Sequence, residues 1–203
     1  MTNSEYIQLA TLAVVIVYTF VTYRLLAAQS RQGFENKFFQ LLNLHHEIVG
    51  AIERYVGQLP VRGRRNFSTF YDEFVSNFQT EYNKNPSADP LQIIQGGYKH
   101  FFENRQPDIG HYFRNLYHII KYVHESKESD KDFYAHLVRA QLSSSELLLL
   151  FYNCLGTKGN EKFKPLAERY SLLENMPENK LASDTLKLSD HRKLYDPKAF
   201  SKD

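Results

Sequence analysis

The stretch RAQLSSSELLLLFYNC, residues 139–154, places charged side chains inside one of the most apolar segments of the chain. Glu146 directly precedes four leucines, Arg139 lies about two helical turns before it, and no Gly or Pro interrupts the run. Burying a charge is costly unless the charge is paired and hydrogen-bonded. The stretch therefore predicts a buried helix whose charges form either a structural ion pair or a site.

The composition around this stretch indicates one compact domain with appendages. The chain has 203 residues, of which 42% are hydrophobic and 24% charged, and this balance excludes a disordered protein. The formal net charge of +2 is too small to indicate nucleic-acid binding by itself. The single cysteine, Cys154, cannot form an intrachain disulfide and is expected to be a small buried side chain in a reducing compartment.

The N-terminal region predicts one transmembrane helix over residues 7–26. No charged side chain occurs between residues 7 and 23, and about 20 mainly apolar residues are enough to span the hydrocarbon. Arg24 can extend towards the interface, where Tyr6 and Tyr23 are suitable anchors. A cleaved signal peptide is the main alternative, but the preceding MTNSE lacks a basic region. A helix buried in the globular domain is the second alternative.

Charges flanking the span predict its orientation. Glu5 precedes the span, whereas Arg24, Arg31 and Lys37 follow, and the positive-inside rule then places the C-terminal domain in the cytoplasm. The predicted organisation is a short extracytoplasmic N-terminus at 1–6, a transmembrane helix at 7–26, a cytoplasmic helical domain at 27–176 and a polar C-terminal tail at 177–203.

Apolar residues recur at helical spacing along the rest of the chain, and no useful β-alternation occurs. The sequence predicts an all-α cytoplasmic bundle of about five to six helices. The expected helices cover 34–55, 67–82, 90–105, 109–125, 129–155 and 161–175. QPDIG at 106–110 is expected to separate the third helix from the fourth. The stripe on the first of these helices also suits self-association between copies.

Polar faces on the helices at 109–125 and 129–155 are expected to meet. A short connection predicts that the two helices pack antiparallel, so Arg114 could pair with Glu146, or Glu146 with His118. The preferred interpretation of this face is a fold-specifying polar seam. The predicted seam comprises His111, Arg114, Tyr117, Arg139, Gln141, Ser143, Glu146 and Asn153.

A catalytic interpretation of the same face stays open. His118 as a general base and Arg114 as a phosphate contact would form a minimal set for metal-free RNA cleavage. HEPN-type ribonucleases resemble this arrangement, although their Arg and His are slightly further apart in sequence than Arg114 and His118. Arg105 and His111 have the wider spacing, but Pro107 and Gly110 are expected to break the helix between them.

Other motifs restrict the function further. No phosphate-binding GxxxxGK[ST], dinucleotide glycine pattern, HExxH or paired CxxC occurs, so we expect no cofactor and no metal. Arg62, Arg64 and Arg65 surround Gly63 in a predicted basic loop. This loop could contact lipid phosphates, nucleic acid or acidic groups of a partner, or it could be a solvated turn.

Three blocks of the sequence resemble the phage abortive-infection family related to AbiC. They are GHYFRNLYHIIKYV at 110–123, RAQLSSSELLLLFYN at 139–153 and KFKPLAERYSLLENM at 162–176. An element of Gly63, Arg64 and Phe67 and the late LYDPKAF add to a resemblance that covers about 34–200. The residues that match in the first two blocks are Tyr112, Phe113, Arg114, Tyr117, Arg139, Gln141, Ser143, Glu146, Phe151, Tyr152 and Asn153.

The resemblance implies bacterial defence in which an infected cell stops supporting phage growth or dies. We therefore predict a single-pass protein of the bacterial inner membrane whose helical domain acts by binding and self-association rather than by catalysis. Its expected partners are the lipid bilayer, further copies of the chain, a phage or host protein, and nucleic acid at the basic loop. The alternatives are a HEPN-like ribonuclease and a membrane-tethered adaptor for another defence protein.

Overall fold

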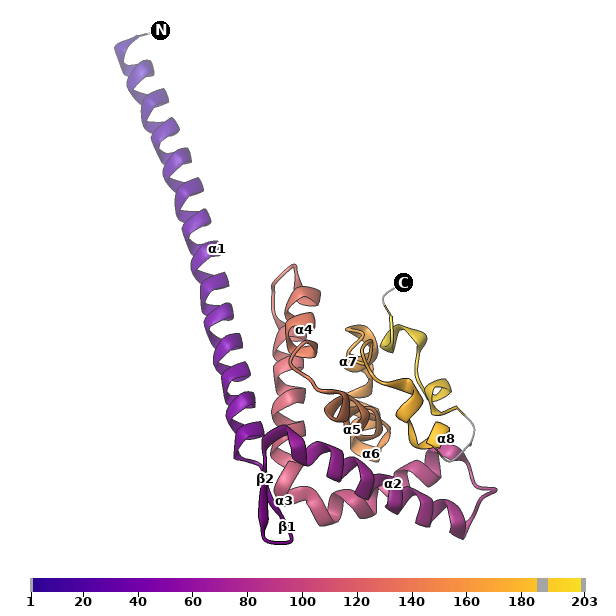
Figure 1. Ribbon diagram of the computed structural model, residues 1–203. Coiled ribbons are helices and arrows are strands. Elements are labelled where there is room, and N and C mark those ends of the chain that lie inside the picture. Colours follow the sequence, from indigo (N-terminus) through magenta and orange to yellow (C-terminus); the bar gives the residue numbers. More distant parts are fainter. Residues whose placement is uncertain (1, 186–189, 202–203) are drawn as a thin grey trace. The chain divides into compact units, whose positions relative to one another are not determined.

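A computed structural model describes residues 2–185 and 190–201 of the chain (Figure 1). The described residues form eight α-helices, four 3-10 turns and one two-stranded hairpin, which confirms the all-α prediction. The chain divides into two compact units, Met1–Gln40 and Leu41–Asp203. Helix α1 (Asn3–Ala51) runs through both units, and every other described helix belongs to the second.

The first half of α1 exposes apolar side chains on all its faces. Its large apolar side chains between Tyr6 and Leu26 are 47–70% exposed. Thr11 and Thr19 donate their hydroxyls to the carbonyls of Ile7 and Val15, at 2.9 and 2.8 Å, so these polar groups are satisfied within the helix. The helix is long and apolar enough to cross a membrane.

A β-hairpin follows α1, where the sequence predicted the end of a helix and a charged loop. Strands β1 (Glu53–Val56) and β2 (Leu59–Arg62) are antiparallel, with Glu53 opposite Arg62. Gly57 opens the two-residue turn with a φ of +64°, a conformation that favours glycine, and this turn chemistry is the signal that was missed. A 3-10 turn, η1 (Gly63–Arg65), leads into the next helix.

Helix α2 (Asn66–Lys84) packs against α3 (Pro90–Glu125) along the predicted apolar faces. Asp89 caps α3 by accepting a hydrogen bond from the backbone N–H of Gln92 at 3.2 Å, and Pro90 occupies the first turn. Phenylalanines line the inner face of α2 at helical spacing. The buried ones are Phe67, Phe70, Phe74 and Phe78.

The predicted break at 106–110 is wrong, because α3 continues through both Pro107 and Gly110. Figure 1 shows instead that α3 bends about halfway along its length. A proline inside a helix removes one backbone hydrogen bond and clashes with the preceding turn, which commonly produces a kink. Pro107 is exposed, while Phe101 and Ile109 on either side of it are buried. Packing therefore maintains the helix on both sides of the bend.

The predicted helix at 129–155 is in fact two helices. Asp130 caps α4 (Lys131–Arg139), and a turn separates α4 from α5 (Ser144–Leu155). Ser143 and Glu146 form a capping box, which starts a new helix at Ser144. The S-x-x-E pattern that marks this start is present at Ser143 and Glu146, inside the long apolar periodicity that predicts a single helix. Phe133, which lies within the predicted helix at 129–155, is 51% exposed.

Two short helices replace the predicted helix at 161–175 and the connection before it. They are α6 (Thr157–Lys162) and α7 (Lys164–Arg169). Gly159 packs so closely on the end of α5 that an added Cβ would lie 1.9 Å from the carbonyl oxygen of Asn153. Beyond α7 the backbone of Ser171 has a φ of +49°, which ends the helical run.

The described part of the C-terminal segment packs onto α5. Its elements are η2 (Glu178–Lys180), α8 (Ala182–Thr185), η3 (His191–Leu194) and η4 (Pro197–Ala199). Tyr195 donates its hydroxyl to the carbonyl of Phe151 at 2.5 Å, and the Tyr152 hydroxyl lies 3.0 Å from Nδ1 of the buried His191. The prediction of a polar tail gave this segment no such packing role.

Candidate functional site

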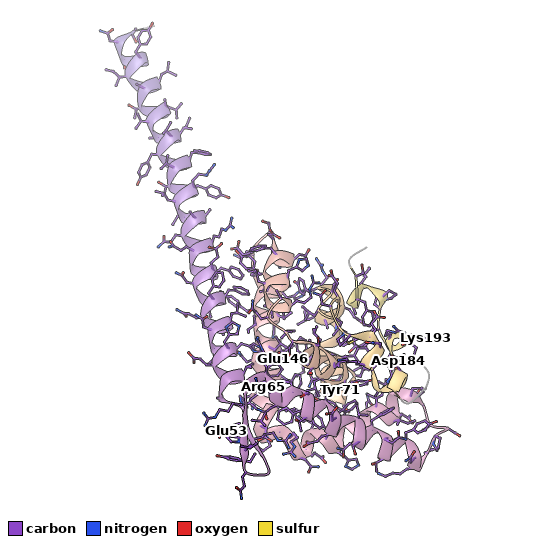
Figure 2. All side chains as sticks on the ribbon, in the orientation of Figure 1. Glu53, Arg65, Tyr71, Glu146, Asp184 and Lys193 are labelled. Atoms are coloured by element: carbon purple, nitrogen blue, oxygen red, sulfur yellow. The ribbon has the colours of Figure 1, made fainter. Side chains whose placement is uncertain are left out.

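Glu146, the charge that the sequence placed among leucines, is fully buried in the first turn of α5. Its Oε2 accepts a hydrogen bond from the backbone N–H of Ser143 at 2.8 Å, and Ser143 Oγ accepts one from the backbone N–H of Glu146 at 3.4 Å. Figure 2 labels Glu146 at this position. The start of α5 therefore holds the carboxylate, with its charge near the positive end of the helix dipole.

The ionic partner of Glu146 is Arg64, which the sequence assigned to the basic loop. Arg64 Nε lies 3.2 Å from Glu146 Oε2, and the Arg64 side chain is 42% exposed. Gly63 fixes the approach, because its φ is +63° and its N–H donates to the carbonyl of Ile52 at 2.8 Å. The buried amide of Asn66 donates to the same Ile52 carbonyl at 3.1 Å. The turn that presents Arg64 is thus tied to the end of α1.

Glu146 does not pair with Arg114 or His118, so both ion pairs predicted for it are wrong. The prediction assumed one helix over 129–155, packed lengthwise on the helix before it. The break before Ser144 instead places Glu146 at the beginning of a separate helix, facing η1. Arg114 Nε donates to the carbonyl of Gly110 at 3.2 Å, and His118 is exposed.

Two buried rings complete the environment of Glu146. Tyr112 of α3 and His45 of α1 are fully buried, with ring centroids 4.9 Å apart. Burial, with a contribution from the charge of Glu146, raises the pKa of Tyr112 well above its usual range. Burial, with smaller contributions from His46 and Arg64, lowers the pKa of His45 to about 4. Both rings are therefore neutral near pH 7.

We call His45, Arg64, Tyr112 and Glu146 the buried polar cluster. Three of its buried atoms, His45 Nε2, Tyr112 Oη and Glu146 Oε1, have no hydrogen-bond partner within the described part of the chain. Buried polar atoms are normally satisfied, so a partly satisfied group marks a strained or functional place. The Arg64–Glu146 ion pair joins η1 to α5, and the ring contact between His45 and Tyr112 joins α1 to α3. This arrangement of buried polar groups needs a functional explanation.

The three arginines of the predicted basic loop have different environments. Arg62 Nε forms an ion pair with Glu53 Oε2 across the hairpin at 2.8 Å, and Arg64 pairs with Glu146. Arg65, labelled in Figure 2, is exposed and forms no ion pair among the residues that the structure describes. The loop is therefore not a uniform basic patch, because two of its three charges are compensated.

The remaining residues of the predicted seam lie in separate places. Arg139 pairs with Glu174 and donates to the carbonyl of Ser171 at 2.9 Å. Asn153 Nδ2 donates to the hydroxyl of Tyr98 at 2.6 Å. His111 on α3 and Gln141 in the turn before α5 are each half-buried. Of the predicted seam, only Ser143 and Glu146 belong to one hydrogen-bonded group.

Arg114, Tyr117 and Asn153 do come together elsewhere, because all three line one cavity beside α3. His118 does not line this cavity. Arg105 and His111 lie on one continuous helix, contrary to the predicted break. However, Arg105 Nε forms an ion pair with Glu73 Oε2 at 2.6 Å. Across residues 2–185 and 190–201, no group of three or more His, Cys, Asp or Glu side chains could hold a metal ion.

Sequence reasoning missed two members of the buried polar cluster. His45 lies on the apolar stripe of the predicted helix 34–55, which is typical of a hydrogen-bonded core residue, and Tyr112 belongs to the block at 110–123. A signal existed for both, since each falls on the inner face of a predicted helix and carries a polar atom there. No signal in the sequence indicated that Arg64, far away in the chain, would reach Glu146.

Residues 104–181 match the sequence model of the family described as "Putative phage abortive infection protein" (putAbiC). The predicted resemblance is confirmed over this segment, which contains all three of the central blocks. The element around Gly63 and the LYDPKAF block lie outside the match. Within the cluster, Tyr112 and Glu146 fall inside the matched segment, whereas His45 and Arg64 precede it. Comparison with curated proteins and with solved structures gives no match.

Proposed function

We propose that this chain is a membrane-anchored phage-defence protein whose helical domain acts by binding and self-association. The observation that carries the proposal is the match of residues 104–181 to the phage abortive infection family. These residues run from the second half of α3 to the end of η2 and include much of the core of the helical unit. The family description concerns abortive infection, so defence against phage is the function that it supports.

The membrane part of the proposal rests on α1. Its apolar run is exposed on every face, whereas the core helix of a soluble protein would be mostly covered. Arg24, Arg31 and Lys37 follow the run, which favours a cytoplasmic location for the helical unit under the positive-inside rule. We propose a single pass through the bacterial inner membrane with this orientation.

Binding rather than catalysis is favoured by the burial of the polar cluster. The side chains of His45, Tyr112 and Glu146 are fully buried, and a catalytic group must touch its substrate. Arg64 is the only member of the four with an exposed part. The cluster is therefore suited to fixing how four elements meet, and a partner that contacts Arg64 from outside could influence that arrangement.

The anchor can be tested by infection of cells that produce variants of the full chain. We expect deletion of residues 1–28 to abolish protection in a plaque assay, and replacement of residues 7–26 by an unrelated single-pass helix to restore it. The replacement is the matched control, because it keeps the membrane attachment while changing the sequence. Full protection by the deleted form, at equal protein level, would show that membrane attachment is not part of the function.

The ribonuclease alternative keeps one favourable observation, since Arg114 and His118 are both exposed, one turn apart on α3. An RNA strand could reach both. Purified protein that degrades RNA, and loses this activity on His118→Ala with the fold intact, would replace the binding proposal. We expect no such degradation. Unchanged protection by the His118→Ala protein would support the same conclusion in cells.

A further inference from the structure

A cavity of about 540 Å³ opens between α3 and the region where α5 meets α6. Its walls come from residues 95–117 of α3 on one side and residues 153–163 on the other. Cavities of a few hundred to about 1,000 Å³ are the usual size of small-molecule sites in proteins. The cavity is separate from the buried polar cluster, none of whose four residues lines it.

Aromatic rings form the apolar part of the cavity. Tyr98 and Phe102 stack with ring centroids 5.7 Å apart and an interplanar angle of 17°. Tyr117, further along α3, packs edge to face with Phe163 of the other wall, and their ring centroids are 5.6 Å apart. Phe102 and Tyr117 are only half-buried, so part of each ring remains available to a ligand. Aromatic faces of this kind favour a planar ring as ligand.

Four cations surround this aromatic lining. Lys99, Arg114, Lys158 and Lys162 line the cavity and are exposed, and none of them forms an ion pair within the ranges that the structure describes. Elsewhere many cations are paired, as Arg62 is with Glu53. Glu103 is the one carboxylate in the cavity lining. The excess of positive charge is therefore left for an anion from outside.

Arg114 is already oriented for such an anion. Its Nε donates to the carbonyl of Gly110 at 3.2 Å, which holds the guanidinium at the cavity wall. Its two terminal nitrogens have no hydrogen-bond partner in the described structure. A guanidinium held by one nitrogen and open at the other two can donate a pair of hydrogen bonds to a phosphate.

We propose that this cavity binds a nucleoside phosphate, with the base against Phe102 and Tyr117 and the phosphates against Arg114, Lys158 and Lys162. The combination of a planar apolar ring and several negative charges in one ligand matches the two halves of the lining. The limited volume favours a free nucleotide over a nucleic-acid strand, and the small net charge of the chain agrees. The proposal goes beyond phage defence and does not depend on it.

The full-length protein in a mild detergent can be titrated calorimetrically with ATP, GTP, CTP and UTP. We expect saturable binding of at least one of them. The nucleoside with the same base as the best-binding triphosphate, and inorganic tripolyphosphate, are measured as well. Each should bind at least about tenfold more weakly than that triphosphate, because each supplies only half of the ligand. Absence of saturable binding would overturn the proposal. Equal binding of tripolyphosphate, or tighter binding of a short oligouridylate, would also overturn it.

Variants of the cavity test its location. Arg114→Ala and Lys158→Ala are exposed changes and should each lower the affinity about tenfold or more. Lys193→Ala is the matched control, since Lys193 is an exposed lysine that does not line the cavity, and it should leave the affinity unchanged. Affinity that is equally insensitive to all three changes would place the ligand elsewhere.

Gly110→Ala tests the shape of the cavity without changing its charge. The added Cβ would lie 3.2 Å from Gln106 Cγ and 3.7 Å from Phe102 Cζ, two side chains that also line the cavity. Alanine is a better helix former than glycine, so the helix itself should tolerate the change. We expect weaker nucleotide binding with an unchanged near-UV spectrum. Retained affinity in a folded Gly110→Ala protein would contradict the proposed position of the base.

Discussion

The apolar run of α1 at residues 7–26 and the helix α5 (Ser144–Leu155) have similar composition but very different surroundings. Large apolar side chains in the α1 run are about half to two-thirds exposed, whereas Leu147–Leu150 of α5 are at most 2% exposed. α5 packs against α2, α3 and α6, while the α1 run has no buried face. Apolar composition alone therefore does not distinguish a helix packed in a protein core from a helix whose apolar surface is exposed.

Length separates the two helices physically. A helix of 12 residues such as α5 spans roughly 18 Å, too little for a hydrocarbon layer of about 30 Å. α1 has the required length, so lipid can take the place that protein takes around α5. The two helices also differ in where their polar side chains find partners. Thr11 and Thr19 of α1 bond within their own helix, but Glu146 of α5 needs Arg64 from another element.

The largest expected effect comes from removing the same side chain in both helices. Leu149→Ala should destabilise the helical unit by about 2–5 kcal/mol, because it leaves a cavity in a closely packed core. Leu12→Ala should change the same unfolding free energy by close to zero, since Leu12 is 56% exposed. Urea unfolding in mild detergent, followed by the near-UV signal of the buried tyrosines, measures both.

Equal destabilisation by the two alanine variants would show that the side chains of the α1 run are packed against protein rather than exposed. A membrane-insertion assay gives the complementary result. There, replacement of Val17 by Lys should disfavour insertion by about 2.5–3.5 kcal/mol near the centre of the bilayer.

The second prediction concerns the charge that α5 carries. Arg64→Ala should destabilise the unit by about 1–3 kcal/mol, because it leaves the buried carboxylate of Glu146 without its cation. The value stays below that of a fully buried pair, since the Arg64 side chain is 42% exposed and solvent screens it. The same unfolding measurement applies, and Arg65→Ala is the matched control.

A change of the acidic partner gives a second test of the same ion pair. Glu146→Gln removes the charge but keeps a capping-box residue at the same position, so the backbone bond from Ser143 can persist. When Glu146→Gln is combined with Arg64→Ala, the loss of unfolding free energy should be less than the sum of the losses in the two single variants. Strict additivity would contradict an ion pair between the two side chains.

The third prediction is a pH dependence confined to the helical unit. Burial lowers the pKa of His45 and of His191, which contacts α5, to about 4 in the folded state, against a usual value near 6.5. The unfolded state therefore binds protons first as the pH falls. Stability is complete above pH 6.5 and is lost towards pH 4, by at most about 1.4 kcal/mol per pH unit for each histidine.

Urea unfolding at a series of pH values between 7 and 4.5 measures this slope. His191→Asn should remove about one half of it, because one of the two titrating groups is gone. A wild-type stability that stays flat over this interval would contradict the burial of both histidines. Glu73 and Asp190 also have lowered pKa values in the folded state, Glu73 because its two arginine partners outweigh its burial and Asp190 because of Arg192. Their contribution to stability is lost as the pH falls towards and below the usual carboxyl pKa of about 4, so it adds to the slope mainly at the acid end of the series.

Local patterns in the sequence predicted much of this fold, and long-range geometry explains what they missed. The inner faces of α2 and α3 and the cap at Asp89 follow from spacing and short-range hydrogen bonds. Continuity of α3 through Pro107 did not follow, because packing on both sides of the proline outweighs its local penalty.

The candidate site shows the same limit. The buried charge at Glu146 could be expected from its position among leucines, and the sequence also showed that it needs a partner. The partner is Arg64, whose approach depends on the hairpin and on the positive φ of Gly63. Helical register predicts partners only on neighbouring helices, so it indicates Arg114 and His118 but not Arg64.

The smallest expected effect again compares a hydroxyl in each helix. Ser143→Ala should cost about 1 kcal/mol, because it removes the acceptor for the backbone N–H of Glu146 and weakens the start of α5. Thr19→Val should cost nearly nothing, since its hydroxyl bonds a carbonyl that already accepts within α1 and valine has the same shape. Unfolding of the two variants in detergent separates these cases. A larger loss of unfolding free energy for Thr19→Val than for Ser143→Ala would mean that the α1 hydroxyl serves a contact outside its own helix. The division between an exposed apolar helix and a core helix would then fail.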